Sequence, residues 1–329
     1  MPKVSVIIPN YNHARFLEKR IQSVLNQTYQ DFEVIYLDVA STDNSNEVFA
    51  KFAGEQRIQA VYNESNSGSP VKQWDKGIRL AQGDYVWIAE SDDYADKRLL
   101  AELVNRLDNN PTVGVAYCQS WIVDECDNTM YSWNEYISSS DKKRWEKDFI
   151  NTGKDECERH LIFSNTIPNA SAVLIRRSIY EQAGYVDETM RLCGDWMLWL
   201  KMLLMSDIAF VAKPLNYFRV HSGTVRHKAY RNGVHVEESY QVISHILGDL
   251  SFAKQVVEQV CEVMIDRWLY TVFLAEGEIP WDRNYRIYKI ASDVDSKLKL
   301  RLLKKTLIWW LRLIPPVRKI GRYVKYALN

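Results

Sequence analysis

The sequence predicts an α/β fold in which a doubly wound, mostly parallel sheet is flanked by helices and followed by a helical extension. Three observations predict it. Short apolar runs alternate with segments of helical period through residues 1–110, which is typical of strand–helix units around a parallel sheet. The strand runs are nearly continuous in apolar residues, as strands buried on both faces are. From about Val234 to Ala275 the apolar spacing is helical.

The elements of the first half follow one another without a long gap. The run Val4 to Ile8 is rich in β-branched residues and stops at Pro9, so we expect the first strand there. A helix beginning near residue 41 has Ser41 or Thr42 available as its N-cap. Further strands are expected over residues 32–37, 58–62 and 85–89, and helices over residues 13–26, 41–52, 70–81 and 96–107.

The second half is less regular. Strands are expected over residues 113–117 and 172–175 and an amphipathic helix over residues 196–205, whereas residues 124–160 show no clear period. We expect a catalytic domain over residues 1–225, divided into a nucleotide-binding half (1–110) and an acceptor half (111–225). A helical extension over residues 226–296 and a basic amphipathic tail over residues 297–329 complete the predicted organisation.

Composition narrows the class of protein. The chain has 329 residues, of which 47% are hydrophobic and 26% charged, the profile of a globular protein. Five widely spaced cysteines without a CxxC pair argue against a disulfide framework and favour a reducing compartment. We expect neither a signal peptide nor a spanning helix, because no uncharged apolar stretch approaches the ~18 residues that a membrane span needs. A dinucleotide-binding dehydrogenase is disfavoured, because the loop after the first strand has no glycine.

Polar residues follow the predicted strands, at the sheet edge where ligands of doubly wound folds bind. Asp92 and Asp93 come directly after the fourth strand. Mg²⁺ and Mn²⁺ prefer such oxygen ligands and often bind one or two carboxylates together with substrate phosphates. The pair is therefore a candidate metal site, and the alternative is a solvated turn that caps the next helix.

Two further loops belong to the same edge. Pro9, Tyr11 and Asn12 follow the first strand, and Asp38 ends the second. An acid at the end of the second strand typically holds a ribose or a base edge in nucleotide-binding α/β folds. The alternative for the segment after Asp38 is a simple helix cap.

The string Gly194-Asp195-Trp196-Met197-Leu198-Trp199 places an acid at the start of an apolar helix. A carboxylate beside an acceptor hydroxyl can act as a general base, and the rings of Trp196 and Trp199 could pack against sugar faces. The alternative is that Asp195 only complements the helix dipole.

Arg219 and His221 alternate in an extended segment, Tyr217 to Gly223. The guanidinium fork suits phosphate oxygens, so Arg219 is a candidate diphosphate contact. His221 could ligate a metal. A structural histidine is the alternative.

Taken together, these strings resemble glycosyltransferase family 2, the inverting enzymes of the Rossmann-like GT-A fold. The matching pieces run in family order over residues 3–223 and are VSVIIPNYNH, SVLNQTYQDFEVIYLD, STDNS, GDYVWIAESDDY, NASAVLIRRSIYEQAGYVDE, GDWMLWLKM and YFRVHSG.

The resemblance implies a role for each matching residue. It implies that Tyr11 stacks near the nucleobase, that Asp38 belongs to the nucleotide-binding pair, and that Asp92 binds on the ribose side. It implies Asp93 as the metal ligand and Asp195 as the catalytic base. Arg219 and His221 are similar to the segment that closes over the diphosphate.

Three departures from the family pattern limit the prediction. Val39 stands where a second acid often reads the base, so UDP, dTDP and GDP sugars all remain open as donors. Gly194 stands where an acid often precedes the catalytic one, which leaves Asp195 as the candidate base of that motif. Met264 replaces the Gln of the QxxRW string of processive synthases, so a single-addition transferase fits better.

The last part of the chain is strongly basic. Ten basic residues and no acidic residue lie between Lys297 and the C-terminus, although the whole chain has 42 of each sign. Leucines and Trp310 recur at helical spacing between Leu300 and Ile314, with basic residues largely on the other side. This pattern predicts an interfacial helix on an anionic membrane surface, and the alternative is packing on the acidic body of the protein. Nucleic acid is not expected, because no recognised nucleic-acid-binding motif accompanies the tail.

The expected activity is an inverting transfer of a sugar from a nucleotide-diphosphate sugar to an acceptor hydroxyl, assisted by Mg²⁺ or Mn²⁺. Family habit suggests a lipid-linked glycan acceptor of the O-antigen or capsule type, at the cytoplasmic, inner face of the plasma membrane. The alternative is a catalytically inactive member of the same fold that binds sugar nucleotides or acts as a scaffold.

Overall fold

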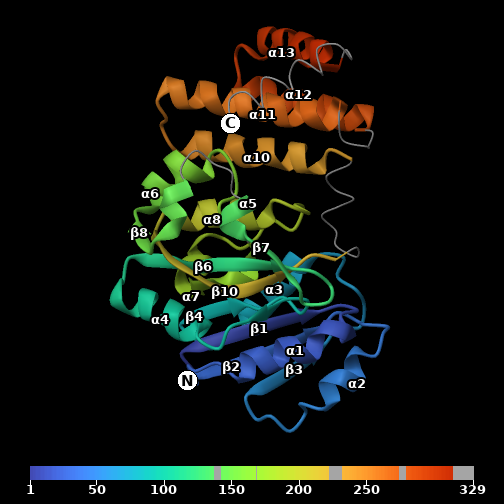
Figure 1. The fold of residues 1–329 in the computed structure, drawn as a ribbon, viewed down its shortest axis with the longest axis vertical. Coiled ribbons are helices and arrows are strands. Elements are labelled where there is room, and N and C mark those ends of the chain that lie inside the picture. Colours follow the sequence, from blue (N-terminus) through green and yellow to red (C-terminus); the bar gives the residue numbers. More distant parts are fainter. Residues whose placement is uncertain (137–141, 168, 222–231, 274–278, 314–329) are drawn as a thin grey trace. The chain divides into compact units, whose positions relative to one another are not determined.

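The computed structural model describes residues 1–136, 142–167, 169–221, 232–273 and 279–313, and these ranges form two compact units. The first unit comprises Met1–Met190 and Gly194–Thr224, and the second comprises Arg191–Cys193 and the chain from Val225. Ser222 and Gly223 of the predicted extended segment, and residues 314–329 of the predicted tail, lie outside the described residues. Figure 1 shows the sheet of the first unit with helices on both of its faces.

The first unit begins with alternating strands and helices, as the sequence predicts. Its elements are β1 (Val4–Asn10), α1 (Ala14–Leu25), β2 (Phe32–Asp38), α2 (Ser45–Ala50), β3 (Ile58–Tyr62), α3 (Pro70–Leu80), β4 (Tyr85–Ile88), β5 (Tyr94–Ala95) and α4 (Leu99–Asn109). Strands β3, β2, β1 and β4 are parallel neighbours in that order. The short α2 starts later than predicted, after Asn44 rather than at Ser41, because Asp38 and Asn12 hold Ser41 to Asp43 in a loop.

The rest of the unit completes a mixed sheet. Its elements are β6 (Val113–Val123), β7 (Thr129–Ser132), α5 (Trp133–Tyr136), β8 (Phe149–Asn151), α6 (Gly153–Glu156), β9 (Val173–Arg176), α7 (Arg177–Gln182), α8 (Gly194–Leu203) and β10 (Asp207–Arg219). Strand β9 pairs antiparallel with both β4 and β6, and β10 is parallel to β6. The sheet order is β3-β2-β1-β4-β9-β6-β10-β5. Outside this order, β7 pairs with β6 and β8 pairs with β10. The predicted central sheet with flanking helices is confirmed. Strand β10 was predicted only at its end, as the extended segment from Tyr217, and the short strands β5, β7 and β8 were not predicted.

The alternation of side chains along β1 determines which helix covers which face. Val6 points into the cluster formed with Leu17 of α1 and Leu103 of α4. Ile7 points to the opposite face, where Gly77 of α3 approaches so closely that an added Cβ would lie 2.5 Å from Ile7 Cγ2. Both faces of the strand are therefore buried, which agrees with its continuous apolar sequence.

The second unit is helical in its described part. It contains α10 (Val234–Asp249), α11 (Lys254–Phe273), α12 (Trp281–Val294) and α13 (Leu298–Leu313). Glu238 of α10 is buried and accepts hydrogen bonds from the backbone N–H groups of residues 191–193. Within the described residues, no helix is both long enough and apolar enough to span a membrane.

Candidate active site

The polar residues predicted to form a site gather at the C-terminal edge of the sheet. Asn10 and Asp38, the last residues of β1 and β2, are register partners. The segment from Glu90 to Asp93 follows β4, the other parallel neighbour of β1. Arg219 ends β10 and donates its backbone N–H to Asp93 Oδ1 at 2.8 Å. Segments that are far apart in the sequence thus meet at one edge.

Two histidines and one carboxylate form the centre of this edge. His221 Nε2 lies 3.1 Å from Asp92 Oδ2, and the rings of His13 and His221 are 5.6 Å apart, nearly perpendicular. The side chains of His13, Asp92 and His221 offer ligand atoms that all lie within 4.8 Å of one another. His13 Nδ1 lies 2.8 Å from Ser91 Oγ, and this contact helps to orient the ring.

Burial and charge set the protonation of this group. Burial alone would raise the pKa of Asp92, but the hydrogen bond with His221 and the nearby charges of both histidines bring it below its usual value. The same hydrogen bond to Asp92 raises the pKa of His221, whereas burial lowers the pKa of His13. Asp92 is therefore the ionised carboxylate of the cluster near neutral pH.

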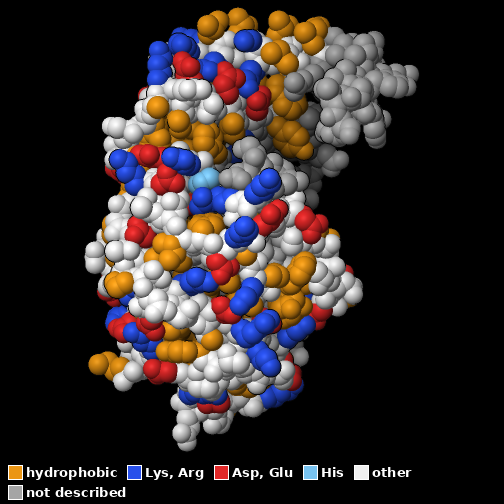
Figure 2. Space-filling view, turned by 60° about the vertical axis from the view of Figure 1, so that its left-hand side comes forward, with side chains coloured by type: hydrophobic (Ala, Val, Ile, Leu, Met, Phe, Trp, Pro, Cys, Tyr) orange, Lys and Arg blue, Asp and Glu red, His pale blue; other side chains and the backbone are white. Residues whose placement is uncertain are grey.

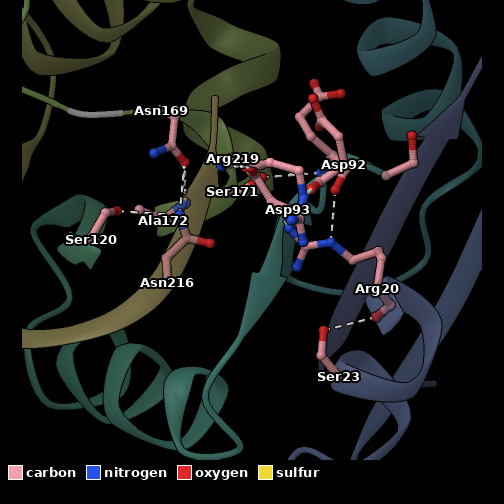
Figure 3. A network of polar contacts seen from close by, with 12 residues as sticks. Arg20, Ser23, Asp92, Asp93, Ser120, Asn169, Ser171, Ala172, Asn216 and Arg219 are labelled. Atoms are coloured by element: carbon pink, nitrogen blue, oxygen red, sulfur yellow. Dashed lines mark hydrogen bonds and ion pairs between the residues drawn. The ribbon is translucent and has the colours of Figure 1, made fainter. Parts of the chain in front are cut away.

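The neighbouring acid, Asp93, lies in a different environment. Its side chain is 2% exposed and faces Arg20, whose guanidinium is 3.9 Å away and fully buried (Figure 3). Burial, followed by repulsion from Asp92, raises the pKa of Asp93 to about 7. The group with metal-ligand spacing contains Asp92. Asp93 accepts from the Arg219 backbone and lies near Arg20, and its expected role as the metal ligand stays a prediction.

Arg219 also differs from its expected role. Its side chain is 2% exposed and donates to the backbone oxygens of Asp92 and Asp124 and to the carboxylate of Asp127. The guanidinium also lies 4.4 Å from the ring centroid of Phe16. With its donors engaged inside the protein, Arg219 is not available as a diphosphate contact in this arrangement. It fixes the end of β10 against the Asp92 loop, and His221 follows two residues later.

The two predicted nucleotide-binding loops, after β1 and after β2, are joined by hydrogen bonds. Asp38 is buried and accepts from Asn10 Nδ2 at 3.1 Å and from the backbone N–H of Ser41 at 2.9 Å. Asn12 adopts φ 57°, a left-handed conformation that asparagine tolerates better than most residues, and its Oδ1 accepts from the backbone N–H of Thr42. Pro9 lies buried at the end of β1, whereas Tyr11 is 42% exposed. Tyr11 is the member of this set with a ring that is accessible for stacking.

Asp195 lies in the first turn of α8 and is partly exposed. Its Oδ1 accepts from the backbone N–H of Trp196 at 2.7 Å, and its Oδ2 accepts from Asn165 Nδ2 at 3.1 Å. The predicted acceptor contacts Trp196 and Trp199 are 3% and 0% exposed. These two tryptophans belong to the core, which corrects the expectation that they stack on a sugar, and Asn165 was missed because it lies in an irregular segment.

Other residues of the site were also missed by sequence reasoning. His13 directly follows the Pro9–Asn12 loop, so its position at a strand end was available as a signal. Glu90 accepts from Trp74 Nε1 at 2.7 Å, and burial, followed by the charge of Asp92, raises the pKa of Glu90 to about 8. Trp74 and Glu90 are 16 residues apart and carry no joint sequence signal.

The arrangement of His13, Asp92 and His221 fits a divalent cation. One ionised carboxylate and two imidazoles converge from three separate segments, which follow β1, β4 and β10. Carboxylates suit Mg²⁺ and Mn²⁺, and imidazoles suit first-row transition metals. The donor set as a whole therefore matches Mn²⁺ better than Mg²⁺.

Comparison with known proteins identifies the class. Residues 5–184 match the family model described as glycosyl transferase family 2. The chain belongs to this family and is a glycosyltransferase enzyme. The glycosyltransferase GlyG of Streptococcus pneumoniae is 25% identical over 272 residues, which cover 78% of this chain and 77% of that protein.

A second relative is matched in both sequence and fold. The poly(ribitol-phosphate) β-N-acetylglucosaminyltransferase TarS of Staphylococcus aureus is 30% identical over 112 residues, 33% of this chain and 20% of TarS. The structure of TarS 1–349 in complex with UDP-GlcNAc superposes with a TM-score of 0.64 at 19% identity and covers 89% of this chain and 80% of that one. A mannosyltransferase from Pyrobaculum calidifontis in complex with GDP-Man and Mn²⁺ gives a TM-score of 0.53 at 16% identity, covering 99% and 85%. These likenesses establish the GT-A fold.

Proposed function

We propose that this protein is an inverting, single-addition transferase that moves a sugar from a nucleoside-diphosphate sugar to an acceptor hydroxyl, with Asp195 as general base. The observation that carries the proposal is the convergence of His13, Asp92 and His221 at the ligand-binding edge of a family 2 chain. These three residues would hold a divalent cation, which supplies positive charge to stabilise the departing diphosphate.

Asp195 performs the proton transfer in this proposal. Its carboxylate takes the proton of the acceptor hydroxyl while the hydroxyl oxygen forms a bond to the anomeric carbon. The bond from that carbon to the phosphate oxygen breaks on the opposite face, and the nucleoside diphosphate leaves with the bonding electrons. Asn165 donates to Asp195 Oδ2 and so restricts the orientation of the base. General-base assistance is typically worth ~10²–10⁴-fold in rate.

The donor nucleotide is inferred from likeness. UDP-sugars are our first candidates, because TarS matches this chain in both sequence and fold and its structures contain UDP and UDP-GlcNAc. Val39 is buried at 5% exposure and donates its backbone N–H to Asn10, so its side chain does not select the base. Tyr11, which is exposed, is the proposed stacking partner of the base.

The acceptor and the location are proposals as well. We infer a lipid-linked glycan of a cell-surface polysaccharide as the acceptor, at the cytoplasmic face of the plasma membrane. The basic composition of residues 297–329 supports a position next to an anionic leaflet.

The variant Asp195→Asn tests the proposed base. The amide preserves the shape and cannot accept the proton, so we expect transfer from UDP-GlcNAc or another responding UDP-sugar to fall at least about 100-fold. Donor binding should persist, as judged by the rise in melting temperature that UDP with Mn²⁺ gives to both proteins. Asp84→Asn, at an exposed acid beside Lys3, is the matched control and should keep full activity. Transfer by Asp195→Asn at the wild-type rate would refute the assignment.

A further inference from the structure

Helix α13 turns basic side chains, rather than its apolar stripe, toward the neighbouring helix α11. An amphipathic helix usually buries its apolar stripe and exposes its charges. Here the basic side chains Arg301 and Lys305 are 14% and 15% exposed and lie against α11. Leu298 and Trp309 share this side of the helix with them, whereas most of the other apolar side chains of α13 are exposed.

The contact between α13 and α11 is a ladder of ion pairs. Lys297 pairs with Glu258, Arg301 with Glu262, and Lys305 with both Glu262 and Asp266. The paired residues Lys297–Glu258, Arg301–Glu262 and Lys305–Asp266 are each 39 positions apart. Because the separation is constant and both residue numbers rise together, the two helices run parallel in a fixed register. One ion pair occurs for about every helical turn.

The ladder continues into aromatic contacts at its end. Trp309 Nε1 donates to Asp266 Oδ1 at 3.4 Å. Its ring stacks on Phe273 and meets Tyr270 edge-on. The rotation of α13 about its own axis is therefore fixed from Lys297 to Trp309.

The fixed rotation leaves an apolar stripe in solvent. Figure 2 shows hydrophobic side chains along the upper border of the molecule, where Figure 1 places α13. The stripe has helical spacing and consists of Leu300 (67% exposed), Leu303 (73%), Leu307 (57%), Trp310 (57%) and Leu311 (41%). Contiguous exposed apolar patches mark sites of interaction with a protein or a membrane.

We propose that α13 lies in the interface of an anionic lipid bilayer, inserting this leucine–tryptophan stripe while the ion-pair ladder on its opposite side holds it on α11. The proposal deepens the membrane location stated under the proposed function. It differs from the sequence prediction in one respect: Arg301 and Lys305 bind α11, and other basic residues would meet the lipid.

Charge on the exposed side selects lipid as the occupant. Lys299 and Lys304 are exposed, and each is next in sequence to a residue of the stripe. The sequence after Leu313 adds Arg318, Lys319, Arg322 and Lys325 with no acid. Anionic headgroups would complement these cations, whereas a second copy of the same face would place lysine against lysine.

Vesicle binding by the full chain tests the proposal without donor or acceptor. We expect co-sedimentation with phosphatidylcholine vesicles that contain phosphatidylglycerol, and about tenfold weaker partitioning of the double variant Leu303→Glu/Leu307→Glu. Because both leucines are exposed, the melting temperature of the variant should equal that of the wild type. Met130→Glu changes an equally exposed apolar residue of the first unit (57%) and should bind as the wild type does.

A second variant separates the charge contribution from insertion. Lys299→Ser/Lys304→Ser should bind phosphatidylglycerol-containing vesicles several-fold more weakly. Neither lysine belongs to the ion-pair ladder, so the contact between α13 and α11 should be unchanged. Equal vesicle binding by Leu303→Glu/Leu307→Glu and wild type would overturn the proposal. The proposal would also be overturned if light scattering showed a dimer of the wild type but not of the leucine variant, and if neither protein bound vesicles. Failure of vesicle binding leaves sugar transfer untouched, so the two proposals fail separately.

Discussion

The cluster around Arg20 and the ladder between α11 and α13 both place basic residues against carboxylates, but in opposite environments. Arg20 and Asp93 are 0% and 2% exposed. In the ladder, Arg301 and Lys305 are 14% and 15% exposed, and the carboxylate partners on α11 are 41–51% exposed. Removing one partner of a buried pair leaves an uncompensated charge away from water. Removing one partner of an exposed pair costs little, because water and salt replace it. The two regions therefore use the same types of side chain for different purposes. The Arg20 cluster shapes the candidate active site, and the ladder fixes the orientation of α13 on α11.

The largest expected effect concerns Arg20. Its Nε donates to the backbone oxygen of Glu90 at 2.7 Å, and its guanidinium faces Asp93 and lies 5.6 Å from the Trp87 ring centroid. Arg20→Met keeps the apolar volume but removes the charge and this donor. We expect the free energy of unfolding to fall by about 3 kcal/mol, measured by urea denaturation.

The matched control for Arg20 is on the same helix. Arg15 is 58% exposed and pairs with Glu125, which is 39% exposed. Arg15→Met should change the free energy of unfolding by less than about 1 kcal/mol. Equal losses in the two variants would show that burial does not distinguish the two kinds of pair.

The second effect concerns metal affinity. His13→Ala removes one of the three proposed ligands, and we expect Mn²⁺ to bind about tenfold more weakly or worse, equivalent to about 1.4 kcal/mol. Electron paramagnetic resonance of free Mn²⁺, with UDP present, measures this directly. His245→Ala is the matched control, because His245 lies on α10 beside Asp249. Unchanged Mn²⁺ affinity in His13→Ala would remove His13 from the ligand set and leave Asp92 and His221.

The sequence predicts the fold well where one pattern governs a whole element. Continuous apolar runs identify β1, β2 and β4, and strand ends identify Asp38 and the Asp92 loop. Antiparallel β9 lies inside the sheet, between β4 and β6, and its direction depends on pairing that a single segment does not encode. Short elements such as β5 depend on their neighbours for the same reason.

The site was only partly predictable for a related reason. Strand-end position located the region but not which of Asp92 and Asp93 turns toward the histidines, because that depends on the buried Arg20. Helical phase is the sequence signal for Arg20, because Arg20 shares the buried face of α1 with Phe16, Leu17 and Ile21. Trp196 and Trp199 were assigned to the acceptor from residue type alone, and their burial shows that type does not give direction.

The smallest expected effect on stability concerns the ion-pair ladder, and it tests the contrast with the buried Arg20 cluster. Lys305→Gln removes the cation that bridges Glu262 and Asp266, and we expect a loss of about 0.5 kcal/mol or less in low salt. Exposed charges are screened over about 10 Å at 0.1 M salt and over about 3 Å at 1 M, so the difference from wild type should shrink as NaCl is added. Thermal unfolding at both salt concentrations measures it, with the exposed neighbour Lys304→Gln as control. A loss of several kcal/mol that persists at 1 M salt would mean that the ladder behaves like the buried Arg20 cluster, and that α13 is part of the core of its unit rather than a surface helix held by charge.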